Sequence, residues 1–232
     1  ITLNASPLIS VGLPTYNRPE SLTRAVACIL SQTYNNLEII ISDNCSTYPL
    51  ADDMFMWFEQ QDSRIKVFRQ KKNIGLALNF QFVLSKATGK YFMWMSDDDF
   101  IDENFIRVLS KVLERFPSVN LAFPALTLYN AHGEKENTSG KYISLESDRP
   151  EQRVYDYFKQ PLKMSYFYGL YRREVIQQFE FTPKMFGADI LLNVCMAFSG
   201  KVLLCAETSY TYYMGGNSFD TEKLAKVIGL SS

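Results

Sequence analysis

The chain has 232 residues, of which 47% are apolar and 21% are charged. These proportions are typical of a folded globular domain and exclude a disordered, collagen-like or low-complexity chain. With 24 Lys and Arg against 25 Asp and Glu, the formal net charge is -1, so no overall basic field favours nucleic acid as a partner.

Apolar, β-prone segments alternate with helical patterns along the first half of the chain. The expected strands cover 8–13, 37–41, 65–68, 91–95 and 119–123, and the expected helices between them cover 19–30, 50–60, 76–87 and 105–116. This alternation is typical of right-handed βαβ crossovers. It predicts an α/β fold in which helices flank a mostly parallel central sheet.

The pattern is looser in the second half. A polar stretch covers 130–150, helices are expected over 152–158 and 187–200, and a strand is expected over 201–205. Aromatic residues gather at Tyr166, Phe167, Tyr168 and Tyr171, and again at Tyr210, Tyr212 and Tyr213. Their rings are suited either to lining a sugar-binding groove or to packing in the core, and the sequence leaves both interpretations open.

The histidine and cysteine content excludes several kinds of catalytic site. The one histidine, His132, lies beside Gly133 in a polar stretch and is expected on a surface loop. This excludes zinc sites with two or more histidines and most Ser-His-Asp triads. The four cysteines form no C-x-x-C pair, which favours a reducing compartment. No signal peptide or long apolar run is visible, and we expect a cytoplasmic protein. The lack of an initial Met suggests either a trimmed chain or one domain of a longer chain.

Three polar clusters follow predicted strands at the point where each strand ends. They cover 14–18 after the first strand, 42–44 after the second and 97–99 after the fourth. Ligands of open α/β sheets bind outside the carboxyl ends of the strands. The sequence has neither a G-x-x-x-x-G-K-[ST] loop nor a G-x-G-x-x-G turn after a strand, so another group would have to hold phosphates there.

Three consecutive aspartates, Asp97, Asp98 and Asp99, form the last of these clusters. Adjacent carboxylates repel one another unless a cation neutralises them. Oxygen ligands favour Mg²⁺ or Mn²⁺, and such ions commonly bind substrate phosphates as well. The alternative is that one aspartate caps the helix that begins near Asp102 while the others are solvated.

Six short motifs occur in order along the first half of the chain. They are PLISVGLPTYNR at 7–18, SQTY at 31–34, LEIIISDNCS at 37–46, NIG at 73–75 with Asn79, TGKY at 88–91 and SDDD at 96–99. Together they resemble the motifs of family 2 glycosyltransferases with the GT-A fold. The resemblance implies one GT-A domain over 1–232, with a Rossmann-like, nucleotide-sugar-binding half over about 7–125 and an acceptor-side half over about 126–232.

The resemblance also implies an activity. This is inverting transfer of a hexosyl or deoxyhexosyl group from a nucleoside-diphosphate sugar to a hydroxyl acceptor, assisted by Mg²⁺ or Mn²⁺. The implied acceptor is a saccharide or a lipid-linked saccharide, and the implied process is the assembly of cell-surface polysaccharide or glycoconjugate. No nucleic-acid partner is expected, and any membrane association is expected to be peripheral, at the inner face of the membrane.

The residue roles of the family are transferred to this chain motif by motif. The implied donor-binding residues are Pro14, Tyr16, Arg18, Asp43, Asn73 and Asp97. Among them, Asp43 follows the second strand, where the family reads the edge of the base. The D-x-D motif of the family falls on Ser96, Asp97 and Asp98, so Ser96 replaces its first aspartate. Asp98 and Asp99 are the implied metal ligands.

The implied general base is Asp189. The family commonly places an acidic pair before a late helix, and in this chain Ala188 stands at the first of the two positions. Asp189 is therefore left to remove the proton of the acceptor hydroxyl. The alternative is that Asp189 caps the helix. The motif GGNS at 215–218 is suited to a loop that closes over the donor.

Two other functions remain as alternatives. A nucleotidyltransferase also combines an α/β sheet with a metal held by carboxylates, but it usually carries a Gly-rich, basic loop after the first strand. This chain has Pro14, Thr15, Tyr16 and Asn17 there. The other alternative is a non-catalytic sugar-nucleotide-binding domain of a larger protein.

Overall fold

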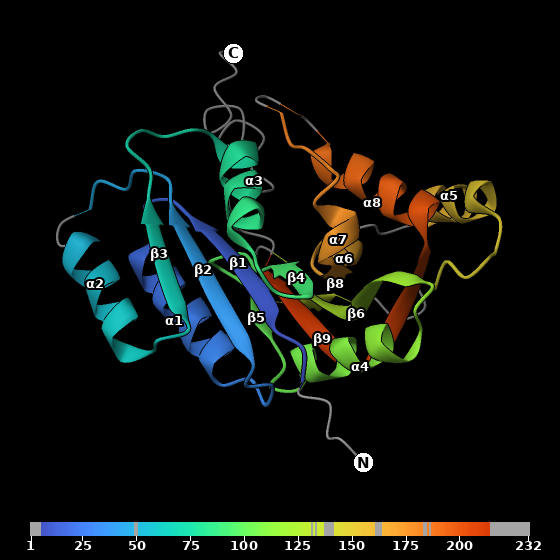
Figure 1. Ribbon diagram of the computed structural model, residues 1–232, viewed down its shortest axis with the longest axis horizontal. Helices are drawn as coiled ribbons and strands as arrows, with labels where there is room; N and C mark the ends of the chain where they lie inside the picture. The colour runs from blue at the N-terminus through green and yellow to red at the C-terminus, as the bar shows by residue number, and fades with distance from the viewer. Residues whose placement is uncertain are drawn as a thin grey trace.

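The fold is of the α/β class, with helices packed against a central sheet (Figure 1). The computed structural model describes residues 6–48, 51–130, 132, 134–136, 142–160, 164–182, 185 and 187–213. The predicted loop at 215–218 lies outside the described residues.

The first half of the chain alternates strands and helices as predicted. The strands are β1 (Ile9–Thr15), β2 (Leu37–Asp43), β3 (Ile65–Arg69) and β4 (Tyr91–Trp94), and the helices are α1 (Pro19–Leu30), α2 (Ala51–Gln61) and α3 (Leu76–Lys86). The strands lie in the order β3-β2-β1-β4, and all three pairs are parallel. The parallel sheet predicted for this half is therefore confirmed.

Burial explains why these segments become central strands. Every residue of β1 and of β2 is buried, and strands of a parallel sheet that are covered on both faces have nearly continuous apolar sequences. Helix α1 begins at Pro19, whose fixed φ suits the first helical turn. The buried side chains of α1, which recur at helical spacing, are Leu22, Ala25, Val26 and Ile29.

The second half adds strands of both directions. The strands are β5 (Phe100–Ile101), β6 (Val119–Tyr129), β7 (Lys135–Glu136), β8 (Leu170–Arg172) and β9 (Lys201–Tyr213), and the helices are α4 (Phe105–Arg115), α5 (Pro150–Lys159), α6 (Met164–Phe167), α7 (Arg173–Ile176) and α8 (Ala188–Ser199). The order across the sheet is β3-β2-β1-β4-β8-β6-β9-β5, with β7 paired to β6. The β6/β9 pair is parallel, whereas β4/β8, β6/β8, β6/β7 and β5/β9 are antiparallel.

The sheet as a whole is therefore mixed but mostly parallel, as predicted, because the long β6/β9 pair is parallel and the antiparallel pairs are short. Strands β6 and β9 also continue to Tyr129 and Tyr213, past their predicted ends at 123 and 205. Both continue beyond an irregularity in their pairing that follows Pro124. The added length of β9 brings Tyr210 into contact with the loop that follows β4.

Trp94, at the end of β4, joins the two halves in one core. Its ring stacks on Phe167 of α6, with centroids 5.0 Å apart and planes 7° from parallel. It also makes an edge contact with Tyr171 of β8. The indole N–H donates to the carbonyl of Phe80 on α3 at 3.1 Å. One side chain thus contacts α3, α6 and β8.

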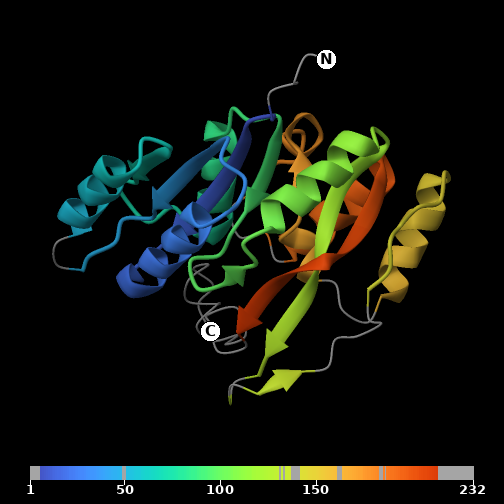
Figure 2. The same ribbon diagram turned by 90° about the horizontal axis from the view of Figure 1, so that it is seen from below.

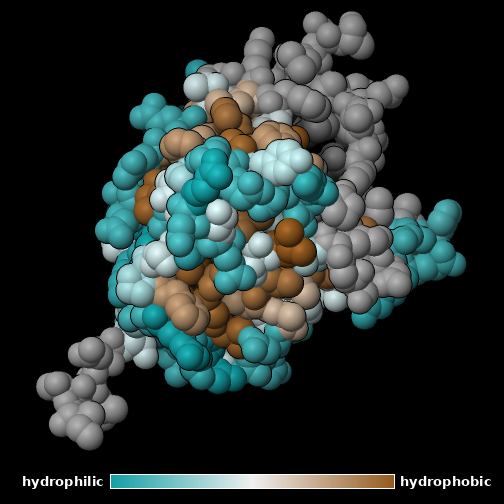
Figure 3. All heavy atoms as spheres, turned by 90° about the vertical axis from the view of Figure 1, so that its right-hand side faces the viewer, coloured by the Kyte–Doolittle hydropathy of each residue, from teal (hydrophilic) through white to brown (hydrophobic). Residues whose placement is uncertain are grey.

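The surface at the α5/α8 end carries apolar side chains. Figures 1 and 2 place α2 and α5 at opposite ends of the molecule, and Figure 3 looks onto the α5 end, where apolar and polar patches alternate. The exposed apolar residues of α5 and α8 are Tyr155, Phe158, Ile190, Leu191 and Phe198. Within the described part of the chain, no helix has both the length and the apolar character that crossing a membrane requires.

Candidate active site

The loop after β1 is fixed by contacts with the loop after β2. Asn17 has a left-handed backbone (φ 54°), which asparagine tolerates better than most residues. Its side-chain oxygen accepts from the backbone N–H of Thr47 at 2.8 Å, and its own N–H donates to the hydroxyl of Ser46. Of the donor residues expected in this segment, Tyr16 is 37% exposed, whereas Pro14 is buried within β1 beside Ser42.

Asp43 ends β2 and is completely buried. Its carboxylate accepts from the backbone N–H and the hydroxyl of Ser46. It also accepts from Nε of Arg69 at 2.9 Å, because Asp43 and Arg69 are register partners on neighbouring strands. A hollow of about 430 Å³ lies beside this group, lined in part by Ser46, Tyr48, Asp52 and Arg69. The partner that sequence reasoning missed here is Arg69.

Asn73 lies in the loop between β3 and α3 and helps to shape that loop. Its side-chain oxygen accepts from the N–H of Gly75 at 2.9 Å and from the side-chain amide of Asn44 at 3.0 Å. The side-chain oxygen of Asn44 in turn accepts from the N–H of Ile74 at 2.8 Å. Asn73 therefore lies next to the end of β2, and its donor-binding role stays a prediction.

The loop after β4 brings Asp97 and Asp98 together with Arg18. Nη1 of Arg18 lies 2.9 Å from Oδ1 of Asp97 and 2.5 Å from Oδ2 of Asp98. Asp97 also accepts from the hydroxyl of Thr15 at 2.7 Å, and Asp98 accepts from the hydroxyl of Ser96 at 2.5 Å. Arg18 and the aspartates are thus brought into one cluster, although the sequence did not predict that they pair with one another.

Burial makes Asp97 electrostatically unusual. It raises the pKa of Asp97 to about 6, although the charge of Arg18 and the hydroxyl of Thr15 favour the ionised form. A nearby cation is therefore needed to keep this carboxylate charged. In this structure the cation is the guanidinium of Arg18.

The pair formed by Asp97 and Asp98 fits a hard divalent cation. Two carboxylate oxygens converge on the single position that Nη1 of Arg18 takes, and oxygen ligands suit Mg²⁺ and Mn²⁺. Over the described residues, no group of three or more His, Cys, Asp and Glu side chains is arranged to hold a metal alone. The arrangement fits an ion that one or two carboxylates share with the phosphates of a ligand.

Asp99 lies in a different environment from its two neighbours. Its Oδ2 accepts from the hydroxyl of Tyr210 on β9 at 2.9 Å. The same hydroxyl accepts from the N–H of Ser96 at 3.2 Å, and the Tyr210 ring stacks on Tyr168 with centroids 4.5 Å apart. The assignment of Asp99 as a metal ligand stays a prediction, and Tyr210 is a positioning partner that the sequence did not indicate.

Asp189 lies in the first turn of α8 and its side chain is exposed. Gly187, with a left-handed backbone, takes the N-cap position, so the interpretation of Asp189 as the helix cap is wrong. Burial raises the pKa of Tyr168 well above its ordinary value, and the charges of Asp99, Asp98 and Asp189 raise it further. The charge of Asp189 thus acts on the pKa of the same hydroxyl as the charges of Asp98 and Asp99.

Most of the aromatic residues considered for a sugar-binding groove belong to the core instead. The buried ones are Tyr166, Phe167, Tyr171, Tyr210 and Tyr212, while Tyr168 is only half-buried. The side chain of Tyr213 lies outside the described residues. His132 is exposed in a turn, as predicted.

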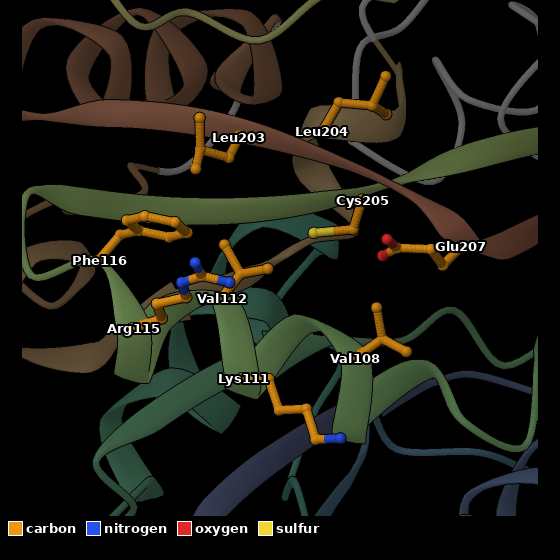
Figure 4. Close-up of a pocket in the computed structure, with 9 residues that line it drawn as sticks. All are labelled: Val108, Lys111, Val112, Arg115, Phe116, Leu203, Leu204, Cys205 and Glu207. Carbon is orange, nitrogen blue, oxygen red and sulfur yellow. The ribbon is translucent and has the colours of Figure 1, made fainter.

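A second hollow lies away from this cluster. It has a volume of about 520 Å³ and lies between α4 and β9. Figure 4 shows Lys111 and Arg115 on α4 at the side opposite Cys205 and Glu207 of β9. No residue expected in the site lines this hollow.

The fold and these clusters define a class of enzyme. The sequence model described as "Glycosyl transferase family 2" matches residues 10–179, and the chain belongs to this family. The glycosyltransferase class expected from the sequence motifs is therefore confirmed.

Three named glycosyltransferases are similar to this chain over different parts of its length. GlyA, a glycosyltransferase of Streptococcus pneumoniae, is 25% identical over 217 residues, which are 88% of this chain and 30% of GlyA. GlyG of the same organism is 40% identical over 106 residues, which are 45% of this chain and 34% of GlyG. TuaG of Bacillus subtilis, named for teichuronic acid biosynthesis, is 31% identical over 153 residues, 66% of this chain and 57% of TuaG. The chain spans about a third of the length of the first two.

Solved structures of TarS from S. aureus have the same fold. A crystal structure of TarS 1–349 superposes with a TM-score of 0.69 at 16% identity, covering 96% of this chain and 64% of the other. The complex of TarS 1–349 with UDP-GlcNAc gives 0.70 at 15% identity, covering 94% and 64%. The expected GT-A fold is therefore confirmed.

Proposed function

We propose that this domain transfers a sugar, with inversion, from a nucleoside-diphosphate sugar to a hydroxyl acceptor. The observation that carries the proposal is the convergence of Asp97 and Asp98 on one cation position, at the carboxyl end of the parallel strands of a family 2 domain. A diphosphate is the ligand that such a pair of carboxylates would bind through a shared divalent ion.

The donor is proposed to lie along the loops that follow β1, β2 and β4. Tyr16 offers an exposed ring for the base, and Asp43 and Asn73 are fixed by hydrogen bonds on either side of the loop after β2. TarS has been crystallised with UDP-GlcNAc and with UDP. These complexes support a uridine nucleotide as the first donor to test.

The chemistry divides between two sets of carboxylates. Asp97 and Asp98, with Asp99 as a further candidate, would hold Mg²⁺ or Mn²⁺, which would supply positive charge to the departing diphosphate. Asp189 is proposed to accept the proton of the acceptor hydroxyl as that oxygen attacks the anomeric carbon. Its exposed position at the start of α8 leaves it accessible to an acceptor from solvent.

The acceptor is proposed to be a saccharide or lipid-linked saccharide used in cell-surface polysaccharide assembly. Ile190 and Leu191, next to Asp189, are 43% and 47% exposed. Apolar side chains beside the proposed base support an acceptor with an apolar part. The name of TuaG, a relative that matches two thirds of this chain, supports the same kind of process. We propose a cytoplasmic location at the inner face of the membrane.

Replacing Asp189 by Asn tests the proposed mechanism. Asp189→Asn should keep the thermal stabilisation by Mn²⁺ with UDP, because ligands that bind only the folded state raise the melting temperature. It should lose transfer by a factor on the order of 10² or more, as removal of a general base does. Asp156→Asn on α5 is the matched control and should leave both properties unchanged.

The same assays separate the alternative functions. Turnover of Asp189→Asn at the wild-type rate would contradict its role as the base. Release of pyrophosphate from a nucleoside triphosphate would indicate a nucleotidyltransferase instead. Stabilisation by nucleotide with no release of nucleoside diphosphate from any donor, with or without acceptor, would indicate a binding domain.

A further inference from the structure

The guanidinium of Arg18 occupies the position where two carboxylates converge. Its Nη1 contacts Asp97 at 2.9 Å and Asp98 at 2.5 Å. The contact with Asp97 has the length of a charge-assisted hydrogen bond, and the contact with Asp98 is shorter still. A side chain of the chain itself thus takes the place that a small cation between these oxygens would need.

The fold does not require the Arg18 side chain to stay there. Arg18 is the N-cap residue of α1, but its side chain makes no capping hydrogen bond. Its contribution to the helix is its backbone carbonyl, which accepts from the N–H of Leu22 at 3.0 Å, and any residue supplies that group. The side chain is 22% exposed, so solvent and ligands reach it.

The charges at this point favour an exchange of cations. One guanidinium faces two carboxylates, which leaves one negative charge unbalanced, whereas a divalent ion would balance both. A diphosphate offers Arg18 a new partner, because the planar guanidinium binds phosphate oxygens in a bidentate manner. The metal ion can therefore replace Arg18 as the partner of the two aspartates, while the diphosphate of the donor replaces the aspartates as the partner of Arg18.

We infer that Arg18 is an internal counter-ion that keeps divalent metal from Asp97 and Asp98 until a nucleoside diphosphate draws its guanidinium away. This inference rests on the proposed function and adds to it a cause for cooperative binding. Metal binding displaces Arg18 from the aspartates and frees it for the nucleotide, and nucleotide binding draws Arg18 away and frees the aspartates for the metal. Each ligand therefore increases the affinity of the protein for the other by the same factor.

Binding of Mn²⁺ alone to the 232-residue chain tests the inference. Arg18→Met removes the charge and keeps a long side chain, and it should lower the Kd for Mn²⁺ about tenfold, the effect of losing a competitor worth ~1.4 kcal/mol. The measurement is calorimetric titration at about pH 8, so that the buried Asp97 is ionised. Saturating UDP should then increase the Mn²⁺ affinity by a smaller factor in Arg18→Met than in the wild type.

Two further variants identify the cause. Arg18→Lys keeps the positive charge and should keep the Kd for Mn²⁺ alone within about threefold of the wild type, because the ammonium still competes for the carboxylates. Arg24→Met, which removes an exposed arginine of the same helix, should not change it. Circular dichroism confirms that each variant is folded.

The outcomes separate this inference from the proposed function. An unchanged or higher Kd for Mn²⁺ in folded Arg18→Met overturns the inference, even if Mn²⁺ with UDP still binds. An equal gain in affinity in Arg18→Lys overturns it as well, because the exclusion would then not depend on charge. If the wild type binds none of UDP, GDP and dTDP with Mn²⁺, the proposed function fails, while the titration with Mn²⁺ alone still decides the role of Arg18.

Discussion

Three consecutive aspartates reach three different environments within one loop. Asp97 is buried against Thr15 and Arg18, Asp98 is half-buried and shares Arg18, and Asp99 is buried against Tyr210. The loop turns between neighbouring residues, so aspartates that are adjacent in sequence have different surroundings. One aspartate can bind a cation while the next accepts a hydrogen bond that stabilises the loop. The geometry favours Asp97 and Asp98 for the first task.

Removing the hydroxyl of Tyr210 tests the structural part of this division. Tyr210→Phe leaves the N–H of Ser96 and the Oδ2 of Asp99 without this partner, and it should lower the free energy of unfolding by about 1–3 kcal/mol, the cost of losing hydrogen bonds at a buried site. Urea unfolding provides the measurement. Tyr155→Phe on the exposed face of α5 is the control and should change stability by less than about 0.5 kcal/mol. Equal stability of Tyr210→Phe and the wild type would mean that the Tyr210 hydroxyl does not hold this loop.

The sequence predicts which candidate residues lie at one edge of the sheet, but it does not predict the partners of their side chains. Residues that end parallel strands share one edge of the sheet, so the proximity of Asp97 to Arg18 follows from the expected topology. The contact between Asp99 and Tyr210 spans 111 positions along the chain, and no local pattern encodes it. It depends on a strand, β9, that extends further than its apolar run indicates.

A buried carboxylate connects β2 to the turn that precedes β4. Oε1 of Glu38 accepts from the hydroxyl of Ser10 on β1, from the N–H and hydroxyl of Thr88, and from the N–H of Gly89, at 2.6 to 3.1 Å. Oε2 accepts from Lys66 on β3 at 3.1 Å. Three strands and one turn are thus held in register by one side chain, far from the site but at the opposite ends of the strands that position it.

Acid should weaken this network in a defined direction. Burial alone would raise the pKa of Glu38, but hydrogen bonds from Ser10, Thr88 and Lys66 outweigh it and the pKa is lowered. Ionised Glu38 therefore stabilises the fold above its unfolded-state pKa of about 4.3, and this stability is lost as the pH falls through the folded-state pKa.

Glu38→Gln makes that prediction measurable. At neutral pH the variant should unfold more easily by about 2 kcal/mol or more, because a buried charged acceptor with several donors is lost. The gap to the wild type in urea unfolding should narrow as the pH falls from 7 toward 3. Glu103→Gln, on an exposed side chain, is the control. A gap that stays constant with pH would mean that ionisation of Glu38 does not stabilise the fold.

A helix or strand can be predicted from the sequence where the local residue pattern marks it clearly. Helix α1 occurs at its predicted position because Pro19 marks its start and four apolar residues recur at helical spacing. Strand β6 is longer than predicted because Pro124, which reads as the end of a strand, is tolerated at an irregularity in the β6/β9 pairing. The short β8 has only three residues, and its place in the sheet comes from tertiary pairing.

The sheet is continuous across the two predicted halves of the chain. Strand β4 pairs with β1 on one side and with β8 on the other, and Trp94 packs into side chains of both halves. A boundary between independent domains normally falls where few contacts cross. We therefore propose that residues 1–232 fold as a single domain.

The two tryptophans of the chain allow this proposal to be tested. Trp57 is 51% exposed on α2, whereas Trp94 is completely buried between the halves. Trp57→Phe leaves Trp94 as the one tryptophan, so its fluorescence reports on the junction while far-ultraviolet circular dichroism reports on the whole backbone. Because the junction and the sheet are the same structure, the two urea transitions should coincide, as in a cooperative unit. A loss of ellipticity at lower urea than the loss of Trp94 fluorescence would instead show that one half unfolds on its own, and the chain would then consist of two units.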